Sequence, residues 1–522
     1  MSLAHKLYKI GKTITDKKII KSLIIRKPDS SIDYDTRAIN FNIKNNSIEY
    51  DDVSNDNCIN VFYTEKIGGS GSAIFYLYPN LLVHNSTLVE VDKKKIKGKF
   101  SQLIATLENI ITYHYANQKN EQILQFILEK ISDKKIIDKL KTYPKGDYLY
   151  LITINNKSLF ERMPEIWDNW FQNPVIPYKD LEPKIFYDFI SLEEMEVGYN
   201  PDIGCYTVNN YNDKLKHRIV DNTPLSKESA RYIKFGWLYL KKNLLFYFDG
   251  MSFAVVPSYI KENEKEFKEI LSKLKIANEQ SHQKRNTLKV LANEEADIKK
   301  VLSKLEKPKQ KDEKKIKETK EELEENRKAK NKLTSKIADG LFTNFRDDIK
   351  DLEFIQGLTV DIIFMELNKN EVKIYGSIED VLPSKISKVV AKMQEYNIDD
   401  SILISNKDNM QTYLHEFFHR DELYFYKMNK RKNDPKDSSY RSKILEERFY
   451  LIKLLLTNSQ ISRADLYKRF EFNTEYDYEH KKRVDAKGMK SWFYEDNGLK
   501  IYQDEQNILS FFGDKEINKI KD

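Results

Sequence analysis

A long charged segment, residues 261–336, limits the possible folds of this chain more than any other feature. It consists almost entirely of Lys, Glu, Asn, Gln and Leu, and its apolar residues recur at mostly helical spacing. Those residues are Leu271, Leu274, Leu288, Leu291, Ile298, Val301, Leu302 and Leu305, and then Ile316, Leu323, Leu333 and Ile337. Because Pro308 interrupts the pattern, we predict two long helices folded back as an antiparallel hairpin. We expect this hairpin to serve in packing and spacing, with most of its charges in solvent.

The rest of the sequence is that of a folded protein without covalent staples. The chain has 522 residues, which at roughly 150 residues per domain suggests two to four domains. It contains two cysteines, Cys58 and Cys205, so a disulfide framework and an all-cysteine metal site are excluded. The N-terminus has no uninterrupted apolar region, and no segment approaches the ~20 apolar residues of a membrane helix. We therefore expect a cytoplasmic protein.

The balance of charge is weakly basic. There are 88 basic and 81 acidic residues, which gives a net charge of +7. A basic chain favours an anionic partner. Richness in Lys, Asn and Ile is also what AT-rich coding produces by itself, so the charge leaves both explanations open.

Local patterns predict several elements before the charged segment. Residues 2–27 predict a short amphipathic helix and an apolar run, 36–63 predict strands around an Asn-Asn turn, and 100–141 predict helices. Residues 142–156 predict a turn and a strand, and the four prolines of 160–187 indicate an irregular packed segment. Ser226 should cap a helix, and Asp249-Gly250 should join strands at 244–248 and 253–257.

After the charged segment, residues 358–376 alternate as two strands around Asn368-Lys369-Asn370, and a helix should begin at Lys385. We predict an α+β fold: a mixed N-terminal domain with antiparallel strands, an inserted helical hairpin and a C-terminal helical bundle. The predicted domains are 1–259, the charged hairpin 260–340, a β-hairpin 341–384 that completes the first domain, and a helical bundle 385–522.

Loops and basic clusters are the candidate nucleic-acid-binding sites. Backbone N–H groups of a glycine-rich loop can approach phosphate closely, lysines can hold phosphates, and aromatic rings can stack on bases. The candidates are Lys66, Gly68, Gly69 and Gly71; Lys93, Lys94 and Lys95; Asn209, Asn210, Tyr211 and Lys214; Lys430 and Arg431; and Lys481, Lys482 and Arg483. Each cluster alone is explained more simply as solvated surface, and the glycine loop, which lacks the Lys-Ser/Thr ending of a P-loop, as a mobile turn.

One short segment suggests a metal site. In His415-Glu416-Phe417-Phe418-His419, two histidines at i and i+4 could bind zinc on one helix face, with Glu416 as general base. Arg420 and Asp421 follow, which is unusual for a metalloprotease, and Glu446 or Glu447 are weak candidates for a third ligand. We therefore favour a structural helix, and we find no catalytic set elsewhere.

Several of these segments, taken in order, resemble the large subunit of type I-B CRISPR Cascade. The run Ile378-Glu379-Asp380-Val381-Leu382-Pro383-Ser384, after an Ile-Phe-Met-Glu strand and an Asn turn, is the most specific part of the resemblance. The stretch SKESARYIKFGWLYLKKNLLFYFDGMSFAVVP, the opening YKIG and the KIGGSGS loop are similar as well. Many members of the family carry four cysteines around 200–230, whereas only Cys205 is present here, which puts a structural zinc in doubt.

The resemblance implies a non-enzymatic protein without a cofactor. It implies as partners the crRNA, a target DNA duplex with its PAM, the backbone, 5′-handle and small Cascade subunits, and a separate helicase–nuclease. The large subunit of that family recognises the PAM and helps to open the DNA, while guide pairing supplies sequence specificity. Two alternatives remain: a zinc metallopeptidase using His415, Glu416 and His419, and a coiled-coil scaffold built on 261–336.

Overall fold

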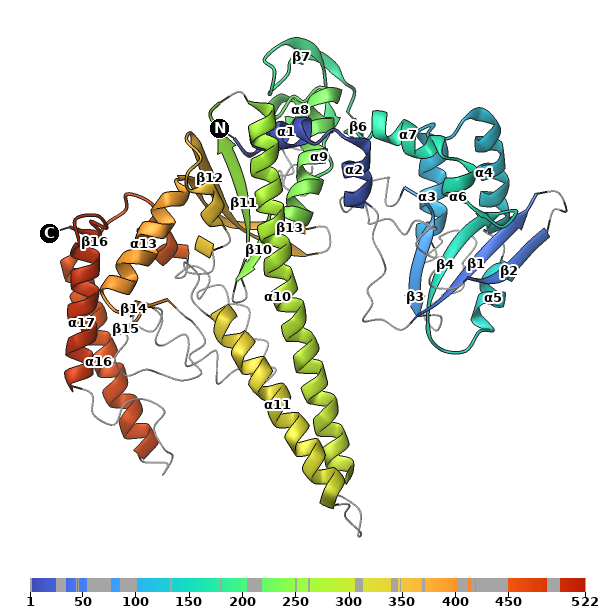
Figure 1. Cartoon of the computed structure of the whole chain (residues 1–522). Helices are drawn as coiled ribbons and strands as arrows, with labels where there is room; N and C mark the ends of the chain where they lie inside the picture. The colour runs from blue at the N-terminus through green and yellow to red at the C-terminus, as the bar shows by residue number, and fades with distance from the viewer. Residues whose placement is uncertain are drawn as a thin grey trace. The chain divides into compact units, whose positions relative to one another are not determined.

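The structure is a computed structural model, and it describes most of the chain. Figure 1 shows the arrangement of the labelled elements. The described residues are 2–24, 34–53 except 44 and 46, 77–84, 101–131, 134–178, 181–203, 218–248, 251–305 except 262, 313–338, 346–368 except 348, 371–400, 412–414, 418, 449–485 and 498–521. The chain divides into two compact units. Unit 1 comprises Met1–Lys242 with Leu367–Lys373, and unit 2 comprises Asn243–Glu366 with Ile374–Asp522.

The main sheet of unit 1 is mixed. It contains β1 (Tyr34–Asn42), β2 (Ser47–Val53), β3 (Asn80–His84), β4 (Asp147–Ile154) and β5 (Lys157–Ser158), in the order β2-β1-β4-β3 with β5 beside β4. β1 and β4 pair in parallel, from Tyr34 opposite Asp147 to Phe41 opposite Ile154. The prediction of antiparallel strands is correct for β1–β2 and β3–β4, and wrong for this central pair.

The helices of unit 1 follow the predicted apolar spacing, with one correction. Between residues 101 and 172 they are α3 (Ser101–Thr112), α4 (Gln118–Ile131), α5 (Lys134–Lys141), α6 (Leu159–Arg162) and α7 (Glu165–Gln172). The irregular segment expected near the four prolines is instead helical at α7, which buries Trp167 and Trp170. Pro164 directly precedes α7, where a missing N–H costs no helical hydrogen bond, so this proline begins a helix and does not break one.

Three small elements precede the last helix of unit 1. A short ladder joins β6 (Ile176–Pro177) to β9 (Tyr199–Asn200), a hairpin joins β7 (Lys184–Tyr187) to β8 (Glu194–Val197), and α8 spans Ile219–Asn222. α9 (Lys227–Asn243) follows. The Ser226 hydroxyl accepts a hydrogen bond from the Ser229 N–H at 3.1 Å, which confirms the predicted cap.

Unit 2 contains a four-stranded sheet in the order β10-β11-β12-β13, formed by Leu245–Phe248, Met251–Tyr259, Leu358–Asn368 and Glu371–Val381. Both predicted strand pairs are present. The first turns of α10 (Glu264–Leu305) pack on the sheet and bury Phe267, Ile270, Leu271 and Leu274. Nearby, the buried Asn278 amide donates to the Leu245 carbonyl oxygen at 2.7 Å.

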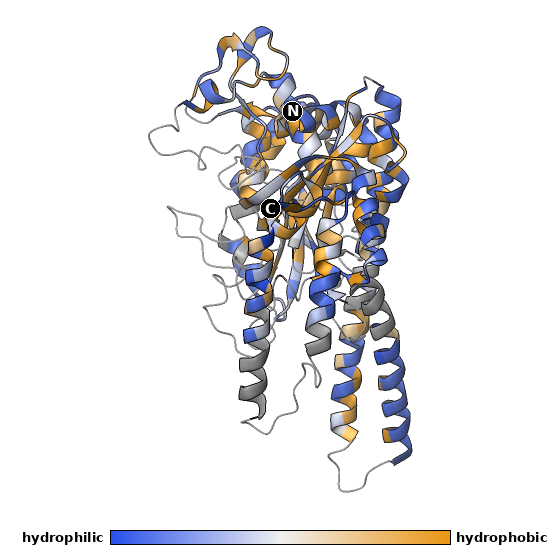
Figure 2. Ribbon diagram, turned by 90° about the vertical axis from the view of Figure 1, so that its left-hand side faces the viewer, coloured by the Kyte–Doolittle hydropathy of each residue, from blue (hydrophilic) through white to orange (hydrophobic). Residues whose placement is uncertain are grey.

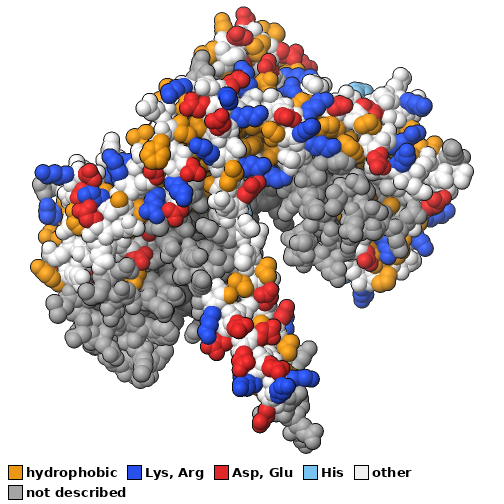
Figure 3. All heavy atoms as spheres, in the orientation of Figure 1, with side chains coloured by type: hydrophobic (Ala, Val, Ile, Leu, Met, Phe, Trp, Pro, Cys, Tyr) orange, Lys and Arg blue, Asp and Glu red, His pale blue; other side chains and the backbone are white. Residues whose placement is uncertain are grey.

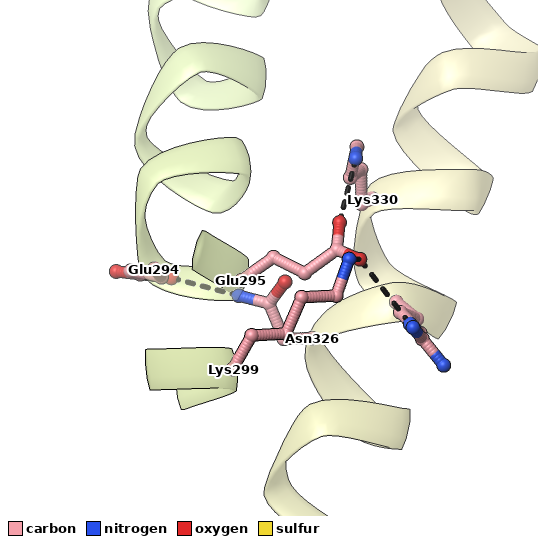
Figure 4. A network of polar contacts seen from close by, with 6 residues as sticks. Glu294, Glu295, Lys299, Asn326 and Lys330 are labelled. Carbon is pink, nitrogen blue, oxygen red and sulfur yellow. Dashed lines mark hydrogen bonds and ion pairs between the residues drawn. The ribbon is translucent and has the colours of Figure 1, made fainter. Parts of the chain in front are cut away.

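The two predicted charged helices are present as α10 and α11 (Glu313–Ala338), which lie side by side (Figure 1). Figure 2 shows many hydrophilic residues along their distal turns. Glu295 of α10 is the polar centre of this pair, and its side chain is only 10% exposed. It accepts from Lys299 at 2.7 Å, from Arg327 at 3.2 Å and from Lys330 at 2.6 Å, while Asn326 donates to Glu294 at 3.0 Å (Figure 4). Polar contacts therefore fix the register of the hairpin beside the buried Leu323.

The C-terminal part of unit 2 is mostly helical. After the short 3₁₀ helix η6 (Lys350–Leu352), it contains α13 (Pro383–Glu395), a helical stretch at 449–456, α16 (Arg463–Asp485) and α17 (Gly498–Gly513). Two short parallel ladders join β14 (Ile398–Asp399) to β15 (Thr412–Tyr413) and β16 (Ile461–Ser462) to β17 (Ile520–Lys521). The Asp514 carboxylate, just after α17, accepts from Tyr396 at 2.8 Å and pairs with Lys392 at 3.2 Å, and thereby connects α13 to α17.

Candidate nucleic-acid interface

Two glycines bring the N-terminal helix α1 (Leu3–Thr13) into backbone contact with α9. A Cβ atom on Gly11 would lie 1.8 Å from the Tyr232 carbonyl oxygen, and one on Gly236 would lie 2.0 Å from the Leu7 carbonyl oxygen. Neither position can carry a side chain unless the helices separate. The crossing therefore fixes α1 firmly on α9.

Lysines dominate the segment that this crossing fixes. Residues 2–24 contain six lysines and one acidic residue, Asp16, and they form α1 and α2 (Lys17–Ile24). The apolar run predicted after the first helix is thus part of a second helix. Lys12, Lys17 and Lys18 are exposed, Lys9 and Lys21 are half-buried, and Lys6 is buried in the packing.

The last turn of α9 adds two more lysines. Lys242 donates a hydrogen bond to the Ser22 carbonyl oxygen of α2, which places its ammonium beside α2, and Lys241 precedes it in the same turn of α9. We call the set Lys9, Lys12, Lys17, Lys18, Lys21, Lys241 and Lys242 the basic surface. Figure 3 shows Lys and Arg side chains gathered where Figure 1 places α1 and α2.

Aromatic rings lie among these cations. The Lys12 ammonium is 5.9 Å from the Tyr8 ring centroid and that of Lys21 is 4.2 Å from the Phe160 centroid. Burial, followed by the nearby Glu228, raises the pKa of Tyr8, so this phenol stays neutral and adds no negative charge. Lys17 is partly neutralised by Asp168 at 2.7 Å. Ammonium groups of this kind neutralise phosphates and release counterions, so the surface is suited to a nucleic-acid backbone.

Most of the candidates chosen from the sequence lie outside the described residues. These are Lys66, Gly68, Gly69, Gly71, Lys93, Lys94, Lys95, Asn209, Asn210, Tyr211, Lys214, Lys430 and Arg431. Their assignment as nucleic-acid ligands stays a prediction.

The structure places Lys481, Lys482 and Arg483 on the last turns of α16. Positive charges at a helix C-terminus are stabilised by the helix dipole, so this cluster has a purely structural explanation as well. A role in binding DNA or RNA is untested for these three residues.

The candidate zinc residues His415, Glu416 and His419 also lie outside the described residues. Phe418, between them, is described and buried. Its ring is 5.8 Å from that of Phe512, and the Arg469 guanidinium lies 4.9 Å from its centroid. Among the described residues, no group of three His, Cys, Asp or Glu side chains could hold a metal ion.

Within the described ranges, no helix is both long enough and apolar enough to span a bilayer.

Sequence reasoning missed the basic surface, although two signals of it are visible. One is the excess of lysine over acid in residues 2–24. The other is a glycine inside each of two helical patterns, in a chain with only 16 glycines. Their meaning depends on the contact between Gly11 and Gly236, which are far apart in sequence.

No curated protein matches the chain. The matching family is described as the central domain of CRISPR-associated protein TM1802, and the match covers residues 206–310, about a fifth of the chain. It includes α8, α9, β10, β11 and α10, but not the Ile378–Ser384 run that carried the most specific part of the resemblance. From α9, on which α1 of the basic surface packs, to the end of the long helix α10, this chain is thus similar to the central domain of a CRISPR-associated protein.

Proposed function

We propose that this chain is the non-catalytic large subunit of a crRNA-guided type I-B CRISPR surveillance complex. The match of residues 206–310 to a CRISPR-associated central domain is the observation that carries the proposal. In this role the chain binds the PAM duplex, promotes unwinding and R-loop formation, and helps to recruit the helicase–nuclease. Its partners are the crRNA, the target DNA and the backbone, 5′-handle and small subunits.

The basic surface supports this role because the matched segment builds part of it. Gly236 lies within that segment and seats α1, and Lys241 and Lys242 extend the surface beside α2. Lysines bind the phosphate backbone of any sequence, and guide pairing supplies specificity in such complexes. A loop must still recognise the PAM, and we propose the segments with Gly68–Gly71 and Asn209–Lys214 for that task.

The proposed activity requires no bond to be broken by this chain. Holding the duplex, separating its strands and presenting them to a nuclease are binding events. Electrostatic contacts are sufficient to hold the displaced strand. A catalytic set and a cofactor are therefore not part of the proposal.

Co-purification from the native host tests the proposal. The tagged chain is isolated, the bound RNA is sequenced, and the co-eluting proteins and zinc are identified. Repeat-derived RNA together with Cascade subunits is the expected result. A monomer with stoichiometric zinc and no RNA would instead support the peptidase, and a homo-oligomer with neither would support the coiled-coil scaffold. Either result would refute the proposed function.

A further inference from the structure

The β7–β8 hairpin of unit 1 exposes an unusual amount of apolar surface. Ile185 is 65% exposed, Tyr187 58%, Phe186 45%, and Leu192, in the loop between the strands, 73%. Ile185 pairs with Glu196 and Tyr187 with Glu194, so these four side chains share one face of the two-stranded sheet. On the opposite face, Met195 and Val197 pack inward with Tyr178, Ile219 and Val220. The Ile185–Tyr187 face is thus left without a covering layer among the described residues.

The same face is acidic. Glu194 and Glu196 lie on it, and Glu193 directly precedes β8. All three are exposed and none of them forms an ion pair with another described residue, although Glu196 accepts a hydrogen bond from the Tyr199 hydroxyl. The only hairpin lysine, Lys184, is paired with Asp221, to which Arg218 also binds. Figure 3 shows mainly apolar and acidic side chains where Figure 1 places β7. The local charge is therefore opposite to that of the basic surface and to the net charge of the chain.

A buried carboxylate holds this hairpin in place. Asp188 is fully buried at the end of β7, and it accepts hydrogen bonds from the N–H groups of Ile190, Ser191 and Ser226 and from the Ser229 hydroxyl, at 2.6–2.9 Å. Burial raises the pKa of Asp188, but these bonds outweigh it and hold the pKa below its usual value, so the group stays charged. The hairpin loop is thereby fixed to the start of α9.

The backbone of the loop is strained at its most exposed apolar residue. Leu192 has a φ of 60°, in the left-handed region that normally favours glycine or asparagine. Such strain costs of order 1 kcal/mol and persists only where the surroundings impose it. Here the Leu192 N–H bonds to the Asp188 carbonyl oxygen at 2.9 Å, and the Asp188 N–H bonds to that of Glu193 at 2.9 Å. The hairpin therefore presents a rigid apolar surface. Because it is already ordered, little conformational entropy is lost when a partner binds.

These observations exclude one class of partner and favour another. Carboxylates without a cationic partner repel the phosphates of DNA and RNA, so the exposed rings are badly placed to stack on bases. Rigid aromatic and aliphatic anchors surrounded by charge are typical of the centre of a protein interface. We propose that the Ile185–Tyr187 face of the hairpin is a docking site for a protein whose surface presents an apolar recess bordered by Lys or Arg. Resting on the proposed function, we assign this partner to the protein subunits of the surveillance complex.

The test uses the full complex purified through this chain from cells that express all subunits. The docking variant Ile185→Ala/Tyr187→Ala changes only exposed side chains, and Glu194→Lys/Glu196→Lys reverses the local charge. Tyr502→Ala, at a 61% exposed tyrosine of α17, is the matched control. We measure subunit stoichiometry after washes from about 0.1 to about 0.5 M salt, and the affinity of the isolated chain for a labelled oligonucleotide.

The proposal predicts that the docking and charge-reversal variants lose one protein subunit, with at least about a tenfold weaker association, while oligonucleotide affinity and the Tyr502→Ala complex stay unchanged. Complete complexes with both variants would overturn this inference and leave the proposed function intact. Loss of oligonucleotide affinity with all subunits retained would assign the hairpin to nucleic acid and also overturn it. A wild-type chain that binds no such subunit, or only a second copy of itself, would refute the proposed function and the assigned partner together. Leu192→Gly is a second docking variant that does not destabilise the hairpin, because glycine accepts the positive φ at this position while the exposed side chain is removed. Loss of the subunit with this variant therefore cannot come from unfolding.

Discussion

The Tyr232 carbonyl oxygen occupies the place where a side chain on Gly11 would begin, 1.8 Å from an ideal Cβ. Gly11→Ala must therefore separate α1 from α9. Alanine favours a helix over glycine by up to about 1 kcal/mol, but overpacking against backbone costs about 1–3 kcal/mol, so we expect net destabilisation and a lower melting temperature. Thermal unfolding followed by circular dichroism measures the effect.

Gly513→Ala is the control for that substitution, because Gly513, like Gly11, lies in the last turn of a helix, and among the described residues an added Cβ there would meet only Ile520, at an ordinary 3.7 Å. We expect the control to melt within a degree or two of the wild type. If Gly11→Ala were equally harmless, the close helix crossing would be wrong.

The basic surface makes a quantitative prediction for nucleic-acid binding. Lys12 and Lys18 are exposed and form no ion pair with a described residue, so Lys12→Glu/Lys18→Glu should unfold nothing. We expect weaker binding to a labelled oligonucleotide of any sequence, with a smaller slope of log affinity against log salt, by about one for each lost phosphate contact. Fluorescence anisotropy at several salt concentrations checks this.

Lys268→Glu, at an exposed position of α10, is the control for a general charge effect. An equal loss with that variant would show that the net charge, and not the basic surface, determines affinity.

Glu295 should make the helical hairpin sensitive to acid. Hydrogen bonds from Lys299 and Lys330, with that of Arg327, lower the pKa of Glu295 to about 2 from an ordinary 4.5. Because the folded-state pKa is depressed, the stabilisation is fully present above about pH 4.5 and is lost as the pH falls towards 2. Glu295→Gln should lower the unfolding free energy at neutral pH by about 1 kcal/mol, since its three cationic partners are partly exposed and screened by water.

The difference in unfolding free energy between the wild type and Glu295→Gln should then shrink as the pH falls from about 4.5 to 2. Chemical denaturation at each pH measures this difference. Glu324→Gln is the matched control: Glu324 lies on α11, and the substitution removes only an exposed ion pair with Lys328 at 3.2 Å. A pH-independent difference for Glu295→Gln would contradict the network.

We expect Lys519 to destabilise the fold at neutral pH. Its side chain is buried, and both its ammonium and that of Lys385, at 3.2 Å, donate to the Thr457 carbonyl oxygen. Burial, and then the positive charge of Lys385, lower the pKa of Lys519 to about 8. The unfolded chain therefore binds more protons than the native one between about pH 8 and 10.5, and stability should rise with pH across that range.

Lys519→Met keeps the aliphatic stem and removes the charge, so it should stabilise the fold by about 1 kcal/mol near pH 7 and abolish this rise. Lys515→Met, at an exposed neighbouring position, should do neither. Denaturant unfolding of both variants at several pH values tests this. Strong destabilisation by Lys519→Met would show that the hydrogen bond of the Lys519 ammonium contributes more to stability than its buried charge takes away.

The sequence was sufficient wherever a signal is local. The Asp249-Gly250 turn, the Ser226 cap and the apolar spacing of 264–305 each act within a few residues, and β10–β11, α9 and α10 followed from them. The pairing of Tyr34 with Asp147 has no such signal, because its register is set by the packing of segments more than a hundred residues apart. The prediction for the Pro-rich segment was wrong for another reason: a proline such as Pro164 is favourable directly before a helix but breaks a helix from inside, and the sequence alone did not show which position it takes.

The candidate site was harder to predict than the fold. Clusters of adjacent lysines are visible in a sequence, but the basic surface joins Lys12, Lys18 and Lys242 from three helices through one close backbone crossing. The apolar hairpin was missed because KIFY lies in the segment 160–187, which the prolines led us to interpret as irregular and packed, and only the exposed fractions of Ile185, Phe186 and Tyr187 show that this surface is uncovered.

The parallel pairing of β1 with β4 has a consequence for synthesis of the chain. On the ribosome, β1 emerges about a hundred residues before its parallel partner β4, and β11 likewise precedes its partner β12 by about a hundred residues, whereas β1–β2, β10–β11 and α10–α11 connect neighbours. The open edges of β1 and β11 should thus be the parts of the nascent chain that chaperones shield longest. Slowing translation once β4 or β12 has left the ribosome should raise the yield of soluble protein more than a pause between the paired strands.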